Sequence, residues 1–262
     1  MDLYNFNPET ILSFILTLFR ISLVVFLLPF LGGEAIPRII KAALCIVLSL
    51  GLWPYLAFEG SYMPDHPIQI AIWLFGELLL GLVLGMVVRF LIAAIQTGGQ
   101  IIGFQMGFAM VNVVDPITGV SEAVTAHFLY MTSMLTFLAL NGHLYMLRGL
   151  TQSFELVPPG GLLITPELVN QVLFFSGQIF VLAVKIAAPI ITAVFLVNLG
   201  LAFISRAAPQ MNVLLIGFPL KIAIGFLFLG MVFEIMSIYV AEFITTLGAN
   251  LYNLLKAGSP AL

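Results

Sequence analysis

The chain has 262 residues, of which 61% are hydrophobic and only 8% charged, and its formal net charge is −3. Ordinary soluble domains carry roughly 25% charged residues, so this composition excludes a soluble globular protein. The lysines and arginines are scattered singly, which excludes a basic patch for nucleic acid. A bilayer core of about 30 Å needs about 20 apolar residues per helix, so the length allows several spans and no separate soluble domain.

Long apolar runs alternate with short polar turns along the chain, which predicts an all-α membrane-type protein of long helical hairpins. The expected helices cover residues 11–31, 39–58, 68–96, 124–150, 167–205 and 213–247. At about 1.5 Å per residue, the helix over 68–96 would exceed a bilayer by several turns. It therefore either tilts strongly or lies partly outside lipid.

The stretch 98–119, GGQIIGFQMGFAMVNVVDPITG, is almost uncharged and supports two interpretations. Gly99, Gly103 and Gly107 recur at every fourth residue, which on a helix forms a small-residue strip where another backbone can approach closely. From Gly103 to Met110, large Phe and Met side chains alternate with small or polar residues, as in an extended chain. Both interpretations remain open from the residues alone.

An extended chain at membrane depth must be enclosed by protein or line an aqueous cavity, because lipid cannot satisfy its backbone. Asp115 precedes Pro116, which disfavours helix at that point. We therefore expect a non-helical plug or gate in this stretch. Its candidate residues are Gly103, Phe104, Gln105, Met106, Gly107, Phe108, Ala109 and Met110. The alternative is ordinary packing, since the chain contains 11 Met and 23 Phe.

Charged residues inside or beside the apolar runs form a second candidate set. Each buried one would cost about 2.5 to 3.5 kcal/mol at a helix centre. They could pair within the chain, pair with other subunits or lie outside lipid, or form an ion pathway. One conjecture pairs Lys185 or Lys221 with Glu77 or Glu234. The set comprises Arg20, Glu77, Arg89, Lys185, Arg206, Lys221 and Glu234.

Catalytic and metal motifs are not found in the sequence. Glu122, His127 and His143 do not have the spacing of a zinc-protease motif. There is also no nucleophile elbow and no glycine-rich phosphate loop. We therefore expect no catalytic residue, no metal and no cofactor, and structural roles for the histidines.

Several motifs resemble the FliR family of the flagellar type III export apparatus, which has injectisome relatives. They are GFQMGFAMVNVVDP at 103–116, NGH at 141–143, SRAAPQMNV at 205–213 and GFPLKI at 217–222. The resemblance extends over essentially the whole chain. It implies a single copy assembled with several copies of FliP and FliQ, with FlhB as a further partner, in the bacterial inner membrane at the flagellar basal body.

The resemblance also implies a division of the chain and a role for the central stretch. Residues 1–180 would be a FliP-like part that includes a plug loop at about 98–119, and residues 181–262 a FliQ-like helical hairpin. The loop would lie beneath a methionine-rich constriction supplied by FliP. The family's assembly is largely lifted out of the bilayer plane, which would account for over-long helices and buried charges.

The function expected from these observations is that of an export gate subunit, which forms and gates the channel for unfolded flagellar substrates. One alternative is a secondary transporter whose helices are broken at Pro189, Pro209 and Pro219 near a midplane site. Another is a structural scaffold in which the central stretch only packs subunits together.

Overall fold

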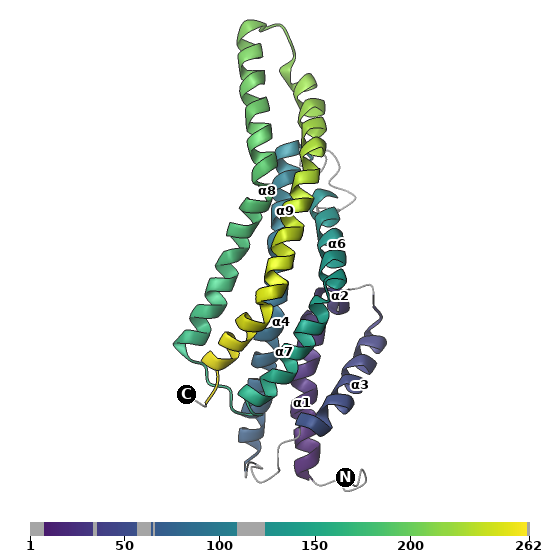
Figure 1. Cartoon of the computed structure of the whole chain (residues 1–262), viewed down its shortest axis with the longest axis vertical. Helices are drawn as coiled ribbons and strands as arrows, with labels where there is room; N and C mark the ends of the chain where they lie inside the picture. Colours follow the sequence, from purple (N-terminus) through teal and green to yellow (C-terminus); the bar gives the residue numbers. More distant parts are fainter. Residues whose placement is uncertain (1–7, 34–35, 57–63, 65, 109–123, 261–262) are drawn as a thin grey trace. The chain divides into compact units, whose positions relative to one another are not determined.

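The structure is a computed structural model that describes residues 8–33, 36–56, 64, 66–108 and 124–260. Every regular element in these residues is a helix (Figure 1), which confirms the all-α prediction. The helices are α1 (Pro8–Leu27), α2 (Pro29–Gly32), α3 (Arg38–Leu56), α4 (Pro67–Met106), α6 (Val124–Ala139), α7 (Gly142–Leu156), α8 (Pro166–Ala207) and α9 (Val213–Ala257).

Four of these helices, α1, α4, α8 and α9, are long and apolar enough to cross a membrane. With 40 residues, α4 is about 60 Å long, about twice the hydrocarbon thickness of a bilayer. The over-long helix expected from the sequence is therefore present, and it extends ten residues beyond the predicted end at residue 96, to Met106.

The chain forms two compact units, which we call the first unit and the second unit. The first unit comprises Met1–Arg89, Asn141–Ser176 and Ile244–Leu262, and the second comprises Phe90–Leu140 and Gly177–Phe243. The helices α4, α8 and α9 each continue from one unit into the other. The predicted division at residue 181 concerns family resemblance rather than packing, and it stays a prediction.

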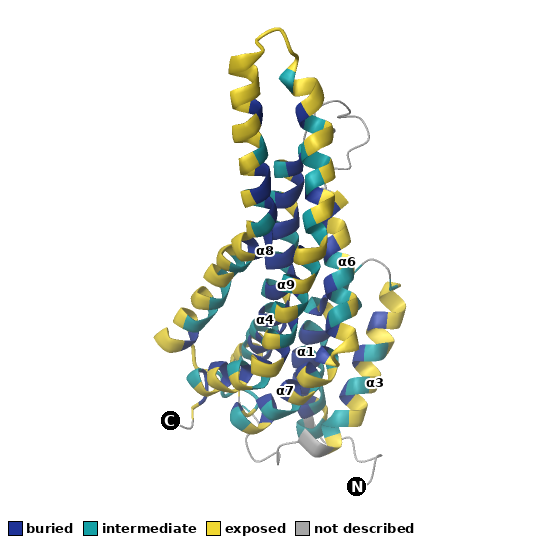
Figure 2. Cartoon of the chain, turned by 45° about the horizontal axis from the view of Figure 1, so that its top comes forward, coloured by how far each residue is buried: buried dark blue, intermediate teal, exposed yellow. Residues whose placement is uncertain are grey.

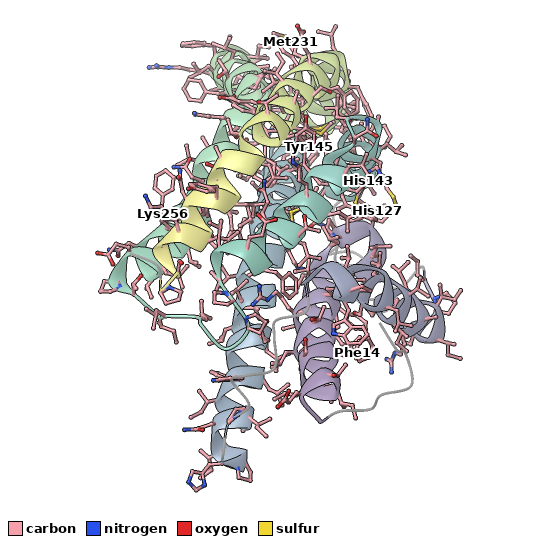
Figure 3. All side chains as sticks on the ribbon, turned by 60° about the horizontal axis from the view of Figure 1, so that its bottom comes forward. Phe14, His127, His143, Tyr145, Met231 and Lys256 are labelled. Carbon is pink, nitrogen blue, oxygen red and sulfur yellow. The ribbon has the colours of Figure 1, made fainter. Side chains whose placement is uncertain are left out.

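In the first unit, α1 packs along α3 and against α4. The ring of Phe14 (Figure 3) meets Trp53 edge-on at 5.8 Å between ring centroids, and the Trp53 indole N–H donates to Ser13 Oγ at 3.3 Å. A Cβ built at Gly85 would lie 2.5 Å from Leu27 Cβ. Glycine at this position therefore allows α4 to approach α1 closely.

In the second unit, glycines likewise allow α4 to approach α6 and α8 closely. A Cβ at Gly99 would lie 2.5 Å from Ala126 Cα of α6, and the Thr125 hydroxyl donates to the Gly99 carbonyl at 2.8 Å. At Gly98, a Cβ would lie 3.0 Å from the Ala183 carbonyl oxygen of α8. Of the predicted glycine strip, Gly99 is thus used for close helix packing, and its neighbour Gly98 serves the same purpose against α8.

The predicted helix over 124–150 is wrong in one respect, because it is two helices. α6 ends at Ala139 and α7 begins at Gly142. Between them, Asn141 has φ 58°, a left-handed conformation that asparagine tolerates better than most residues. By contrast, α8 continues through Pro189 and α9 through Pro219.

Candidate gate segment and charged residues

The last turn of α4 carries the first residues of the predicted gate. Gly107 has φ 90°, and its N–H donates to the Phe104 carbonyl at 3.1 Å. The Phe108 N–H donates to the Gly103 carbonyl at 3.0 Å. This pair of hydrogen bonds around a left-handed glycine is the Schellman motif, which ends helices. The helix therefore ends at Met106, because Gly107 after it adopts positive φ without steric cost.

The helical interpretation is correct as far as Met106, and the extended interpretation is wrong for Gly103–Met106. Within this turn, Gly103 and Met106 are buried, Gln105 is half-buried and Phe104 is 71% exposed. Gly107 and Phe108 follow as half-buried turn residues. The remaining candidate gate residues, Ala109 and Met110, lie outside the described residues, as does the rest of the predicted plug loop.

The end of α4 is anchored on α9 within the second unit. A Cβ built at Gly225 would lie 2.6 Å from side-chain atoms of Met106, so this thioether lies flat against the α9 backbone. The Phe108 ring meets Phe226 edge-on at 6.5 Å. A Cβ at Gly107 would lie 2.9 Å from the Phe218 ring. The candidate gate thus begins directly at a helix end that α9 holds in place.

Two of the predicted charges, Arg20 and Glu77, form a buried ion pair in the first unit. Arg20 of α1 is 0% exposed and Glu77 of α4 is 2% exposed. Arg20 Nε donates to Glu77 Oε2 at 2.5 Å and Nη2 to Oε1 at 2.9 Å. Planar guanidinium matches a carboxylate in this two-pronged geometry, which gives the strongest class of charged hydrogen bond.

The other Arg20 donors are directed to the end of α7. Nη1 donates to the Ser153 carbonyl at 3.0 Å and to its Oγ at 3.2 Å, and Nη2 donates to the Val157 carbonyl at 3.1 Å. The Phe154 ring lies 4.0 Å from the guanidinium carbon. In addition, the Gly160 N–H donates to Glu77 Oε1 at 3.0 Å. All five N–H groups of Arg20 are satisfied, as a buried arginine requires.

The remaining five charged residues of the set are not buried in the single chain. Arg89, Lys185, Arg206 and Glu234 are exposed, and Lys221 is half-buried. The Lys185 ammonium lies 5.8 Å from the Tyr239 ring centroid. None of these five side chains forms an ion pair with a described residue. The conjecture that Glu77 pairs with a lysine is therefore wrong, because its carboxylate is taken by Arg20.

Sequence reasoning missed the partners of the buried charges, including Ser153 and Val157. It also missed Lys41, which is 7% exposed and whose ammonium caps α2 by donating to the Gly32 and Gly33 carbonyls at 3.0 and 2.7 Å. The sequence gives no signal for this cap, because Lys41 lies in the next helix, eight and nine residues after the two glycines.

The histidines belong to packing contacts. His143 of α7 (Figure 3) lies edge-on to Phe30 of α2, with ring centroids 6.3 Å apart. The His127 ring lies 6.2 Å from that of Tyr130. Among the described residues, no group of three or more His, Cys, Asp or Glu side chains is placed to hold a metal ion.

These observations define the class of the protein as an all-α protein of membrane type, with a long helix that ends at a left-handed glycine and with unpaired charges in its second unit. A comparison with known families is more specific. The model of the bacterial export proteins, family 1, matches residues 11–247, so the chain belongs to that family. This confirms the resemblance drawn from the motifs, and it agrees with the prediction that the chain is not an enzyme.

Curated relatives support the same assignment. The flagellar biosynthetic protein FliR of Bacillus subtilis (strain 168) is 29% identical over 249 residues, covering 93% of this chain and 94% of the relative. FliR of Escherichia coli (strain K12) is 30% identical over 241 residues, covering 91% and 89%. The surface presentation of antigens protein SpaR of Salmonella typhimurium is 28% identical over 215 residues, covering 82% and 80%.

Proposed function

We propose that this chain is a gate-forming subunit of the flagellar type III export apparatus in the bacterial inner membrane. It would line and close a channel for unfolded flagellar export substrates. The membership in the export protein family and the names of its relatives support the apparatus. The observation that carries the gating role is the end of α4, where an anchored helix stops at a left-handed glycine and the candidate gate begins.

The mechanism we propose is steric closure by the segment from Gly103 to Met110. Met106 is buried against Gly225, which holds the helix end in place next to the left-handed turn at Gly107. Gly107 is suited to be the pivot because its backbone has the widest choice of φ and ψ. Phe and Met side chains are soft and adaptable, so they can seal a narrow channel and yet be displaced by a passing polypeptide.

The partners we propose are several copies of FliP and FliQ around one copy of this chain, together with FlhB. Charges without a counter-charge support this. Arg89 of the first unit and Lys185, Arg206, Lys221 and Glu234 of the second have no ion-pair partner among the described residues. If such side chains lie at membrane depth, neighbouring protein must satisfy them, because lipid cannot.

The proposed FliP-like and FliQ-like parts, 1–180 and 181–262, would join inside a helix. Residue 181 lies within α8, which is unbroken from Pro166 to Ala207. A fusion of two helical ancestors at this point would therefore require helix on both sides of the junction. We keep this division as part of the proposal.

The transporter alternative loses the broken helices on which it depends. α8 and α9 run through Pro189 and Pro219 without a break, and Pro209 lies in the turn between them. An experiment distinguishes the scaffold alternative from the gate. If the central stretch is only a scaffold, its variants should fail to assemble; if it is a gate, its variants should assemble and leak.

Deletion of residues 104–110 tests the gate directly. We expect the variant chain to assemble with its partner subunits, and vesicles containing the complex to release a small fluorescent dye faster than vesicles with the wild-type complex. The matched control is the Gly51→Ala complex, since a Cβ at Gly51 meets nothing within 4 Å. Dye release equal to that of the wild type from a fully assembled deletion complex would overturn the gating role.

A further inference from the structure

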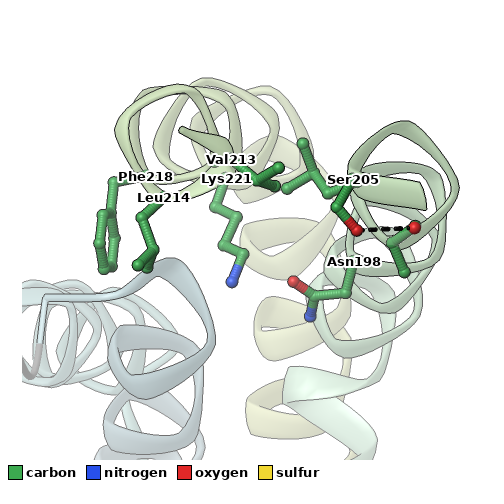
Figure 4. A pocket seen from close by; sticks show the side chains of 9 residues that line it. Asn198, Ser205, Val213, Leu214, Phe218 and Lys221 are labelled. Atoms are coloured by element: carbon green, nitrogen blue, oxygen red, sulfur yellow. Dashed lines mark hydrogen bonds between the residues drawn. The ribbon is translucent and has the colours of Figure 1, made fainter. Parts of the chain in front are cut away.

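The ends of α8 and α9 have different surroundings in the two units. In the second unit, the turn at 208–212 joins them beside a groove of about 290 Å³, whose lining includes Asn198 and Lys221 (Figure 4). Figure 2 shows both helices largely exposed next to this turn. In the first unit, the start of α8 and the end of α9 instead meet the connection between α7 and α8, residues 157–165. Hydrogen bonds define that meeting in detail.

One hydroxyl group, that of Thr165, links the start of α8 with the end of α9. Its Oγ1 accepts from the Leu168 N–H at 3.1 Å, which is the N-cap hydrogen bond of α8. The same Oγ1 donates to the Ala257 carbonyl at 2.6 Å. This carbonyl is one of the last four of α9, which find no partner within their own helix. Thr165 therefore caps two helices at once.

Two further hydrogen bonds hold the residues that follow α9. The Leu163 N–H donates to the Gly258 carbonyl at 3.0 Å. The Ser259 hydroxyl donates at 2.7 Å to the carbonyl of Leu156, the last residue of α7. The ends of α7 and α9 and the start of α8 thus meet in one place. We call it the helix-end junction, and it comprises residues 156–165 and 257–259.

The connection is fixed to α4 at Gly160. The Gly160 N–H donates to Glu77 Oε1 at 3.0 Å, and the residue has φ 76°. A Cβ built at Gly160 would lie 2.5 Å from the Trp73 ring. Trp73 and Glu77 are four residues apart, so they lie on the same face of α4. Only glycine fits this point, because any side chain would meet the ring and a left-handed backbone.

Arg20 holds the first part of the connection against Glu77. Its Nη2 donates both to Glu77 Oε1 and to the Val157 carbonyl. The ion pair therefore fixes the connection at residues 157 and 160. Leu163, which contacts the end of α9, is three residues further on, and three residues span at most about 10 Å. A larger displacement at Gly160 must consequently pull Leu163 away from Gly258.

We propose that the helix-end junction is a latch that the Arg20–Glu77 ion pair holds closed. While the pair is formed, the connection stays on α4 and caps the end of α9. When the pair separates, the connection and the end of α9 are released together, because partial opening would leave buried polar groups without partners. The inference does not depend on the proposed function. It means that the end of α9 cannot move against α4 within the first unit until the latch opens.

The experiment measures hydrogen exchange of backbone amides by mass spectrometry, on the purified full chain in mild detergent. Glu77→Gln weakens the ion pair without a change of size. We expect the Leu163 amide and the amides of 254–259 to exchange about tenfold faster or more. Amides of 213–243, the part of α9 in the second unit, should be unchanged. The matched control is Glu234→Gln, which makes the same substitution at an exposed carboxylate of the second unit and should alter none of these rates.

A variant at the other end of the latch tests the coupling in reverse. Thr165→Val removes the hydroxyl and leaves Arg20 and Glu77 in place. Because coupling between two sites is reciprocal, the Gly160 amide should then exchange faster. Thr165→Ser keeps the hydroxyl and should restore the wild-type rate. This arm decides the question even if Glu77→Gln fails to fold.

The double variant Glu77→Gln, Thr165→Val distinguishes one latch from two independent contacts. In a single latch, the second substitution acts on a junction that is already open, so its effect on exchange at Leu163 should be far smaller than in the wild type. Independent contacts would give effects that multiply. Multiplying effects, an unchanged Leu163 rate in a folded Glu77→Gln chain, or an unchanged Gly160 rate in Thr165→Val would each overturn the inference.

Discussion

The two units differ in their half-buried and buried charges, which are paired within the chain in the first unit and unpaired, among the described residues, in the second. In the first unit, Arg20 and Glu77 are buried, and every Arg20 donor is matched within the chain. In the second unit, Lys185, Arg206 and Glu234 are exposed and Lys221 is half-buried without a counter-charge. The contrast teaches that the buried charges of the first unit are matched within the chain, whereas these four charges of the second unit have no counter-charge among the described residues.

The long helices also differ in burial. In the most apolar stretch of α4, 56% of the residues are buried, compared with 11% in that of α9. Exposed apolar side chains alone do not distinguish lipid from protein neighbours, because both are apolar. The charges do distinguish them, because only protein or water can meet a lysine or a glutamate.

The largest expected effect is at Arg20. Arg20→Met would leave Glu77 buried with the Gly160 N–H as its remaining donor, so we expect a loss of about 3–5 kcal/mol in the unfolding free energy of the purified chain in detergent. The double variant Arg20→Met, Glu77→Leu removes both charges and should cost clearly less. If the single variant were no less stable than the double, the first unit would not depend on this pair.

A second effect concerns the close contact of α4 with α1. Gly85→Ala adds a Cβ that would lie 2.5 Å from Leu27 Cβ, and such overpacking typically costs about 1–3 kcal/mol. Gly51→Ala is the matched control, because a Cβ there meets nothing within 4 Å and alanine favours helix by up to about 1 kcal/mol. Thermal unfolding of both variants would measure the difference. Equal stability would mean that α4 does not need a glycine here.

A smaller effect is expected at the end of α4 in the second unit. Gly107→Ala forces a side chain into φ 90° and toward Phe218, at a cost of about 1–2 kcal/mol. Gly230→Ala, in open space on α9, is the control and should be neutral or stabilising. The free energy of unfolding tests the helix cap, and dye release from vesicles tests the gate. A stable, tightly closed Gly107→Ala complex would contradict the role of Gly107 as a pivot.

The smallest effect on the single chain is expected at the exposed charges. Lys185→Met and Glu234→Gln should each change its unfolding free energy by less than about 0.5 kcal/mol, because their side chains are exposed. Both should nevertheless lower the yield of the assembled complex. If either variant assembles normally, the charge that it removes does not pair with a partner subunit.

Much of the fold could be predicted from the sequence because long apolar runs in a membrane-type chain leave few choices besides helix. The break at Asn141 was missed because the runs on either side are both apolar, and only the left-handed conformation of one residue separates them. The end of α4 was placed too early because alternating Phe and Met side chains imitate an extended chain. Gly107 carries the helix cap, and its role in the candidate gate stays a prediction.

The charged set was found from composition, but its pairing was not. A sequence shows that Arg20 and Glu77 lie within apolar runs, and it does not show that they lie on facing sides of α1 and α4. The carbonyls of Ser153 and Val157 carry no sequence signal at all, because any residue supplies a carbonyl. These hydrogen-bond acceptors of Arg20 can be identified only when the packing of α7 is known.

The most direct test of this account is the mass of the intact particle that contains this chain, after co-expression with its neighbouring membrane proteins and purification in mild detergent. The account predicts a large particle with one copy of this chain among several copies of smaller helical subunits. A lone chain or a simple homodimer would contradict it, because the charges of the second unit would then be completed by no other subunit.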